Sequence, residues 1–120
     1  MKSLFISAIL GLILCSPSYA GLRTIGSGSA IRLDPSGFPP DMKDRYERIM
    51  KVRCVKCHTL ERAIIAVKTG VAPISGLPFN KSSTRAYGVK MLLKPDSDMT
   101  KPETREVIIL LNYLLDEAAR

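Results

Sequence analysis

The sequence predicts an all-α domain of three main helices and connecting loops. Apolar residues recur at helical spacing in three long stretches, and turn-forming residues separate these stretches. A Cys-x-x-Cys-His motif at residues 54–58 is the attachment signature of c-type haem. At 120 residues, the chain has the length of a single domain.

Residues 1–20 have the features of a secretory signal peptide. Lys2 provides a positive charge, residues 4–14 are apolar, and Ser18-Tyr19-Ala20 forms a small-x-small cleavage site. The apolar stretch is shorter than a transmembrane helix requires. We therefore expect cleavage after Ala20, a periplasmic location and no permanent membrane anchor.

The mature chain is expected to begin with a flexible N-terminal arm at residues 21–37, followed by the haem-binding domain at residues 38–120. The arm is rich in Gly and Ser and has no apolar periodicity, although Ile25, Ile31 and Leu33 could attach part of it to the domain. The chain as a whole carries a net charge of +7. A basic charge can indicate nucleic-acid binding, but an exported protein is not expected to meet nucleic acid.

The first main helix is predicted over residues 39–56. Two prolines suit its first turn, where a backbone N–H has no helical partner. Acidic residues then lie near its start and basic residues near its end, which is the order that the helix dipole favours. Its apolar face consists of Met42, Tyr46, Ile49 and Met50. The haem motif therefore begins where this helix ends.

The haem motif provides Cys54, Cys57 and His58. The two thiols can add to the two vinyl groups of one porphyrin, and the histidine can ligate the iron. A zinc site would need four Cys or His ligands, but outside the motif the chain has no His and only Cys15, within the signal peptide. A thioredoxin-type disulfide would accompany a βαβ pattern, and none is visible. One covalent haem c is the expected cofactor.

The middle of the chain predicts a short helix, a loop and the second main helix. Residues 59–67 have apolar helical spacing, and residues 70–80 contain two Gly and two Pro, which indicate a loop. We expect this loop to cover one face of the haem with Pro73, Ile74, Leu77 and Phe79. Ser82 or Ser83 can cap a helix that extends to Leu93 and ends before Pro95.

The last main helix has a clear start signal. Thr100 is the expected N-cap, Glu103 completes a capping box, and Pro102 is tolerated in the first turn. A wide apolar stripe follows, formed by Val107, Leu110, Leu111, Leu114, Leu115 and Ala118. The helix is long enough to cross the first helix and close the core.

With this helix order and the haem motif, residues 41–118 resemble a class I c-type cytochrome. In that family the first helix leads into the motif, the middle helix leads to a methionine ligand, and the last helix packs across the first. Tyr113-Leu114 is similar to the family's aromatic-Leu pair, and residues 87–91 with Met99 are similar to a subset of bacterial monohaem domains. The resemblance implies a small cytochrome c fold.

The first helix departs from the family pattern. The family usually has a glycine eight residues, and an aromatic residue four residues, before the first haem cysteine. Tyr46 and Met50 occupy these positions, and we expect them to pack against Tyr113.

The sixth iron ligand is expected to be a methionine, because His58 is the only histidine. Met42 and Met50 belong to the apolar face of the first helix. Met91 matches the methionine of the family subset, whereas Met99 precedes a helix cap, where an apolar residue is typical. Met91 is therefore the preferred ligand; Met99 is the alternative, followed by an open or lysine-ligated iron.

Residues 62–95 contain no Asp or Glu but six basic residues: Arg62, Lys68, Lys81, Arg85, Lys90 and Lys94. This stretch includes the segments expected to cover the haem. The basic residues either form an ordinary solvated face or surround the exposed haem edge and steer an acidic redox partner towards it. Arg62 is the first candidate to bind the haem propionates.

These features predict a periplasmic electron-transfer protein whose iron cycles between Fe(III) and Fe(II). We do not expect an enzyme, because a haem peroxidase needs a distal acid–base group, usually a histidine, and the chain has no second one. Two alternatives remain open: a haem-based sensor of small ligands or redox state, and an electron-exit subunit of a larger oxidoreductase.

Overall fold

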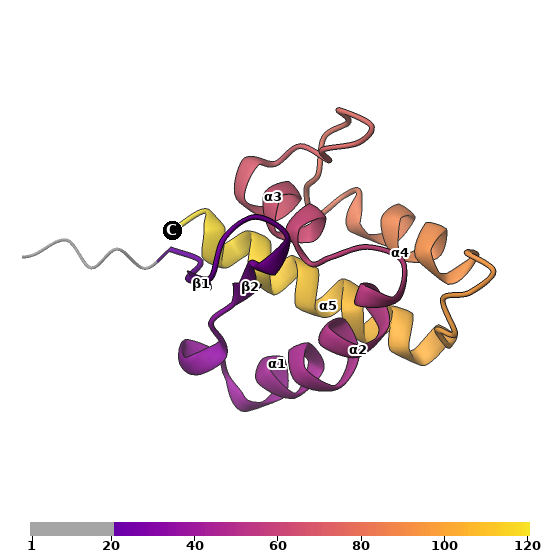
Figure 1. Ribbon diagram of the computed structural model, residues 1–120, viewed down its shortest axis with the longest axis horizontal. Helices are drawn as coiled ribbons and strands as arrows, with labels where there is room; N and C mark the ends of the chain where they lie inside the picture. Colours follow the sequence, from indigo (N-terminus) through magenta and orange to yellow (C-terminus); the bar gives the residue numbers. More distant parts are fainter. Residues whose placement is uncertain (1–20) are drawn as a thin grey trace, which may run out of the picture.

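The longest helix, α5 (Lys101–Ala118), runs through the middle of the molecule, with α3 and α4 on one side and α1 and α2 on the other (Figure 1). In the computed structural model, which describes residues 21–120, the predicted capping box of α5 is confirmed: Thr100 Oγ1 accepts a hydrogen bond from the Glu103 amide, and the Glu103 carboxylate accepts one from the Thr100 amide. The predicted signal peptide lies outside the described residues.

The predicted first helix forms as one continuous helical run from Pro40 to Lys56, but its winding changes along its length. It consists of α1 (Pro40–Arg45), a π-helical turn η3 (Tyr46–Met50), α2 (Lys51–Arg53) and a 3₁₀ turn η4 (Cys54–Lys56). The wide π turn contributes three of the four buried residues of the run, Tyr46, Ile49 and Met50, and η4 contributes the fourth, Cys54. The run therefore faces α5 mainly through η3.

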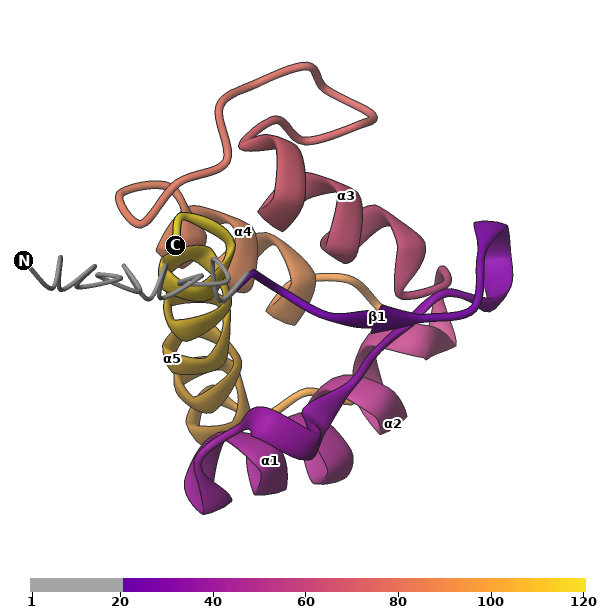
Figure 2. The ribbon, with the colours of Figure 1, turned by 90° about the vertical axis from the view of Figure 1, so that its left-hand side faces the viewer.

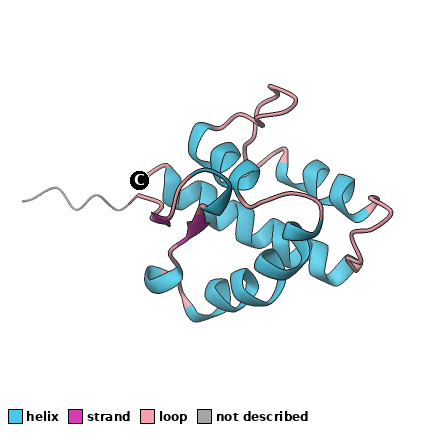
Figure 3. Ribbon diagram, in the orientation of Figure 1, coloured by secondary structure: helices cyan, strands magenta, loops and turns pink. Residues whose placement is uncertain are grey.

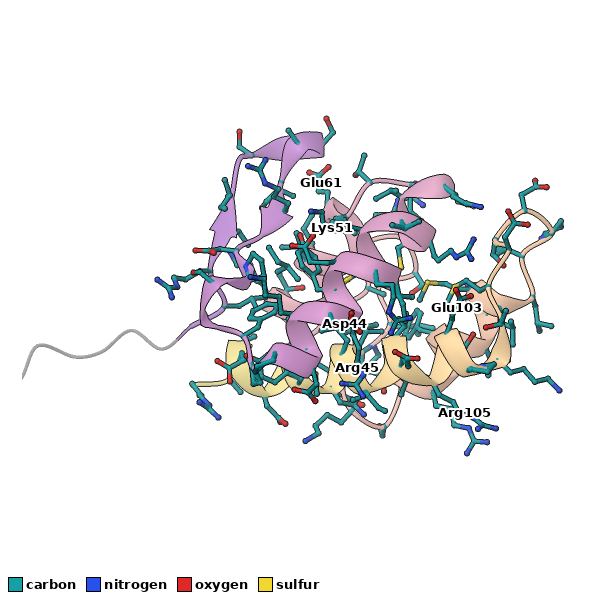
Figure 4. All side chains as sticks on the ribbon, turned by 90° about the horizontal axis from the view of Figure 1, so that it is seen from below. Asp44, Arg45, Lys51, Glu61, Glu103 and Arg105 are labelled. Carbon is teal, nitrogen blue, oxygen red and sulfur yellow. The ribbon has the colours of Figure 1, made fainter. Side chains whose placement is uncertain are left out.

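Two ion pairs connect this run to the start of α5. Arg48 lies 2.6 Å from Glu106, and Arg53 lies 3.2 Å from the capping residue Glu103. Figure 4 shows this side of the molecule, with Asp44 on the first run and Glu103 on α5, while Arg105 extends away from the body. Acidic residues on this side are thus largely paired with neighbouring cations.

Two shorter helices lie on the other side of α5 (Figure 2). The short helix predicted at residues 59–67 is α3 (Glu61–Thr69), which ends at Gly70 in a left-handed conformation, φ 71°. The predicted second main helix is α4 (Thr84–Leu92) with Ser83 at its N-cap. The Ser83 side chain does not cap the helix, because its hydroxyl instead bonds the backbone N–H and C=O of Asn80.

Helix α4 approaches α5 closely at Gly88, which is buried. A Cβ atom built there would lie 2.8 Å from Ile108 Cγ1 and 3.3 Å from Thr104 Cγ2, both on α5. One helical turn earlier, the buried Thr84 hydroxyl donates a hydrogen bond to the Asn112 side chain of α5 at 2.8 Å. The contact between these helices therefore depends on Gly88, which has no side chain, and on the neighbouring hydrogen bond between Thr84 and Asn112.

The segment at residues 21–37, expected as a flexible arm that Ile25, Ile31 and Leu33 could attach to the domain, contains regular elements. It forms a small antiparallel pair of strands, β1 (Thr24–Ile25) and β2 (Arg32–Leu33), with two 3₁₀ turns, η1 (Gly28–Ala30) and η2 (Pro35–Gly37). Leu33 is buried in the core, and the Tyr46 hydroxyl accepts a hydrogen bond from its N–H (3.0 Å) and donates one to its C=O (3.3 Å). Burial of one leucine and pairing of its backbone attach the segment to η3.

Phe38 contacts both Tyr46 and Tyr113, the two tyrosines that were expected to pack together. Its ring meets that of Tyr46 edge-on at 6.1 Å and that of Tyr113 edge-on at 5.3 Å. This arrangement is one that aromatic rings favour.

The described residues form a mostly helical domain with little strand (Figure 3). Within this part of the chain, no helix has both the length and the hydropathy that crossing a membrane would require.

Candidate functional site

A cavity of about 310 Å³ opens between the end of the first helical run, α3, α4 and α5. Its wall is mostly apolar and includes Met50 from η3, Ala63 and Ala66 from α3, and Val107 and Leu111 from α5. The two alanines follow each other at helical spacing on the side of α3 that faces the cavity, where longer side chains would fill the space. Small ligands bind in cavities of this size and character, of about 300 to 1,000 Å³.

Three residues predicted to bind haem or its iron line this single cavity: Cys54, His58 and Met91. They come from η4, the turn after it and the last turn of α4. Cys57, the second predicted attachment residue, is an exposed free thiol and does not line the cavity. Over residues 21–120, no three His, Cys, Asp or Glu side chains gather as a metal site.

Cys54 is buried, and burial raises the pKa of its thiol from the ordinary 9.0 to about 11. The cause is desolvation, since a thiolate loses its hydration in apolar surroundings. A buried, protonated thiol is a weak nucleophile and a weak metal ligand. Cys54 is therefore protonated at neutral pH and does not serve as a free thiolate there.

His58 is partly exposed, and its Nδ1 lies 2.8 Å from the backbone carbonyl oxygen of Thr59. A carbonyl can only accept a hydrogen bond, so Nδ1 carries the proton in this arrangement. The neutral ring then has an unprotonated Nε2 with a free lone pair, which is the form that binds a metal. The same hydrogen bond sets the orientation of a ligating imidazole.

The structure separates the two methionine candidates. Met91 lines the cavity from α4. Met99 does not line it; its side chain packs against the hydrophobic core, and its backbone N–H donates to the Ser97 hydroxyl at 3.3 Å. Met99 thus has the packing role that its position before the α5 cap predicts.

The loop between α3 and α4 contributes to the cavity wall, as expected, but not with all the predicted residues. Pro73, Ile74 and Phe79 line the cavity, whereas Leu77 is 60% exposed and lines a neighbouring groove. Ser75 lines both the cavity and the groove. Residues 72–74 thus line the cavity, whereas Leu77 and Pro78 line the groove.

Three basic residues line the cavity: Arg62 from α3, Lys90 from α4 and Lys94 just after α4. No acidic residue is among the lining residues, and in the described chain none of the three cations forms an ion pair. Lys81, from the same acid-free stretch, is by contrast paired with Asp116 at 2.9 Å. The cavity therefore combines apolar walls with unpaired positive charge.

Two features of the site were not predicted. The first is the role of Ala63 and Ala66 in the cavity wall. These two small residues lie three positions apart in the helix after the motif, and this spacing could have indicated that they share one face. The second is a hydrogen-bond contact between Tyr87 of α4 and Ser75 of the loop, at 3.4 Å between the hydroxyl oxygens. No local pattern in the sequence signals that contact, because the loop conformation determines it.

The chain was compared with protein-family models, with curated proteins and with solved structures, and none of the three comparisons finds a match.

Proposed function

We propose that this protein is a periplasmic electron carrier with one covalently attached haem c. The observation that carries the proposal is that Cys54, His58 and Met91, which come from two segments more than thirty residues apart in the sequence, line one apolar cavity. In the proposal, Cys54 and Cys57 would hold the haem through thioether bonds, and His58 and Met91 would ligate its iron. The fold would then be the small cytochrome c fold.

The residues present suit this cofactor. A porphyrin has an apolar face and two acidic propionates, and the cavity has apolar walls with Arg62, Lys90 and Lys94 as cationic partners. The imidazole Nε2 of His58 and the thioether of Met91 are a ligand pair known to bind haem iron. The bound haem would supply the redox chemistry, as its iron cycles between Fe(III) and Fe(II).

The protein's own residues would tune that chemistry in two ways. The Thr59 carbonyl, by accepting the Nδ1 proton of His58, keeps the imidazole in the ligating tautomer and increases its basicity. A methionine thioether favours the ferrous state compared with a second nitrogen ligand, so we expect a comparatively high reduction potential. Two filled axial positions leave no place for a substrate, so we propose a carrier and not an enzyme.

Partner docking is proposed at the cationic side of the cavity. The unpaired Arg62, Lys90 and Lys94 would attract an acidic redox protein, and the exposed Ile74 next to them offers apolar contact. Acidic residues on the opposite side, such as Glu106, are paired with cations and would not repel such a partner strongly.

The decisive experiment is a reduced-minus-oxidised absorption spectrum of the exported protein, combined with a redox titration. We expect a haem c spectrum that survives denaturation and acid extraction, because the haem is covalently attached. The Cys54→Ser, Cys57→Ser double variant is the control and should lose the covalent haem. An exported wild-type protein without covalent haem would contradict the proposal.

Carbon monoxide separates the carrier from a haem-based sensor. A ferrous carrier with both axial positions filled should bind carbon monoxide slowly or not at all at neutral pH. Rapid binding would instead favour the sensor, in which a weak methionine ligand is displaced. Elution of the native protein with a larger complex in size-exclusion chromatography would favour an electron-exit subunit.

A further inference from the structure

The loop at residues 70–80 projects from the body of the molecule between α3 and α4 (Figures 1 and 3). Both ends of its projecting part are tied down. The Phe79 N–H donates to the Gly70 carbonyl at 2.8 Å, and Val71 and Pro78 form an isolated β-bridge. The buried Phe79 ring also packs against the ring of Tyr87 at 5.0 Å. The loop therefore has a closed base from which its tip extends.

The tip of the loop, residues 72–77, is held by internal hydrogen bonds but is weakly attached to the rest of the protein. The Gly76 N–H donates to the Ala72 carbonyl at 2.8 Å, and the Ala72 N–H donates to the Leu77 carbonyl at 2.9 Å. These bonds hold the tip as one turn, yet Ile74 is 75% exposed. In the described structure, the side-chain hydrogen bond from the tip to a helix is the contact between Ser75 and Tyr87.

This contact lies at the edge of the cavity. Ser75 and Tyr87 both line the cavity, and both also line the adjoining groove, so the pair stands between the two spaces. At 3.4 Å the hydroxyl oxygens are farther apart than in a strong O–H···O bond, which is about 2.7 Å. A weak, partly exposed bond of this kind can break and re-form without disturbing the core.

We propose that residues 72–77 form a movable strap over the cavity and that Tyr87 is the positioning residue that holds the strap closed. The inference rests on the proposed function and extends it, because the strap would control the access of small ligands and water to the face of the cofactor opposite His58. Closure keeps Pro73 and Ile74 against the cavity, and opening exposes Met91 to competing ligands.

The test measures imidazole binding to the ferric holoprotein by stopped-flow absorption. Ser75→Ala and Tyr87→Phe each remove the hydrogen bond between the two hydroxyls. Ser75→Ala also removes the bond that the Ser75 hydroxyl accepts from the Leu77 N–H at 3.3 Å, so Tyr87→Phe is the more specific variant. Loss of one net hydrogen bond should increase the binding rate by about two- to tenfold. The double variant should show little further increase, because the two hydroxyls act through one contact. Ser29→Ala and Tyr113→Phe, which remove matched hydroxyls outside the cavity, should keep the wild-type rate.

Hydrogen exchange of the same proteins provides a readout that does not depend on ligand binding. In Ser75→Ala and Tyr87→Phe, the peptide covering residues 71–79 should exchange faster, while α5 should exchange as in the wild type. Unchanged imidazole rates and unchanged exchange in a protein that carries haem would overturn the strap but leave the proposed function intact. Absence of haem would contradict the proposed function. In that case, faster exchange of the 71–79 peptide in the two variants would still support the strap, and unchanged exchange would overturn it.

Discussion

Met91 is the residue on which the proposed redox potential depends most, because it is the methionine that lines the cavity. We expect Met91→Ala to lose the near-infrared band that arises from sulfur-to-iron ligation. The potential should fall by on the order of 0.1 V, a fraction of the roughly 0.8 V that axial ligands span. Absorption spectroscopy and redox titration measure both. Met99→Ala is the matched control and should keep the band; if Met91→Ala also keeps the band and the potential, Met91 is not the ligand.

Cys54 provides a pH-dependent prediction for the chain before haem attachment. Its thiol pKa is raised to about 11, so at pH 7 only about one molecule in ten thousand carries the thiolate. In the Cys57→Ser variant, alkylation of Cys54 by iodoacetamide should accelerate about tenfold per pH unit from pH 7 to 10. The rate should level off near pH 11. A rate that already levels off near pH 9 would show that the thiol is not buried.

The same shift affects stability with a defined sign. Because the folded chain holds the Cys54 proton more tightly than the unfolded chain, the associated stabilisation is complete below about pH 9 and is lost as the pH rises through about 11. Thioether formation removes the titratable proton. The holoprotein should therefore lack this alkaline loss of stability.

At the scale of secondary-structure elements, the attachment of β2 to η3 depends on one hydroxyl. Tyr46→Phe removes the hydrogen bonds to the Leu33 N–H and C=O and leaves two buried backbone groups without these partners. We expect the free energy of unfolding to fall by about 1 to 3 kcal/mol. Urea unfolding followed by circular dichroism measures the change. Tyr113→Phe is the control, and an equal loss in both variants would contradict a specific role of Tyr46.

The contact between α4 and α5 depends on the missing side chain at Gly88. Gly88→Val would place atoms within van der Waals contact of Ile108 and Thr104, since a Cβ alone already comes within 2.8 Å of Ile108. Overpacking of this kind typically costs about 1 to 3 kcal/mol. Thermal unfolding of the holoprotein provides the measurement. Ala86→Val, at an exposed position of the same helix, should change stability by less than about 0.5 kcal/mol.

A combined variant separates a local clash from a general effect on α4. Ile108→Ala removes the side chain that the new valine would meet. If the clash is the cause, Gly88→Val should cost less in the Ile108→Ala background than in the wild type. An identical cost in both backgrounds would show that the helix itself, and not the contact, is affected.

At the scale of the whole molecule, charge is unevenly distributed. Ion pairs join the first helical run to α5, whereas the cavity has unpaired Arg62, Lys90 and Lys94. These three cations give the cavity a positive charge that no acidic lining residue offsets. Such a field attracts anionic partners and is screened by salt.

Ferricyanide, an anionic oxidant, tests this asymmetry. Oxidation of the ferrous protein should slow as the salt concentration rises. The Lys90→Glu, Lys94→Glu variant should react on the order of tenfold more slowly at low salt. The Lys43→Glu, Lys101→Glu variant has the same net charge but leaves the cavity unchanged, and it should react nearly as fast as the wild type. Equal slowing in both variants would indicate an effect of net charge alone.

Local sequence patterns were sufficient to predict most of the helices. The capping box at Thr100 and Glu103 and the break after residue 92 depend on residues within a few positions of each other, so they can be read from the chain directly. The haem motif is local for the same reason. The sequence did not show how residues 21–37 attach to the domain, because the buried Leu33 is held by Tyr46, thirteen residues further along.

From the sequence alone we predict which residues could bind haem and approximately where the main helices lie. That Met91, and not Met99, shares a cavity with Cys54 and His58 is evident only in the folded chain. The folded chain likewise shows that Gly88 is the contact point of two helices. The physical reason is that a cavity and a helix contact are formed by side chains far apart in the chain, whose distances depend on packing and not on sequence spacing.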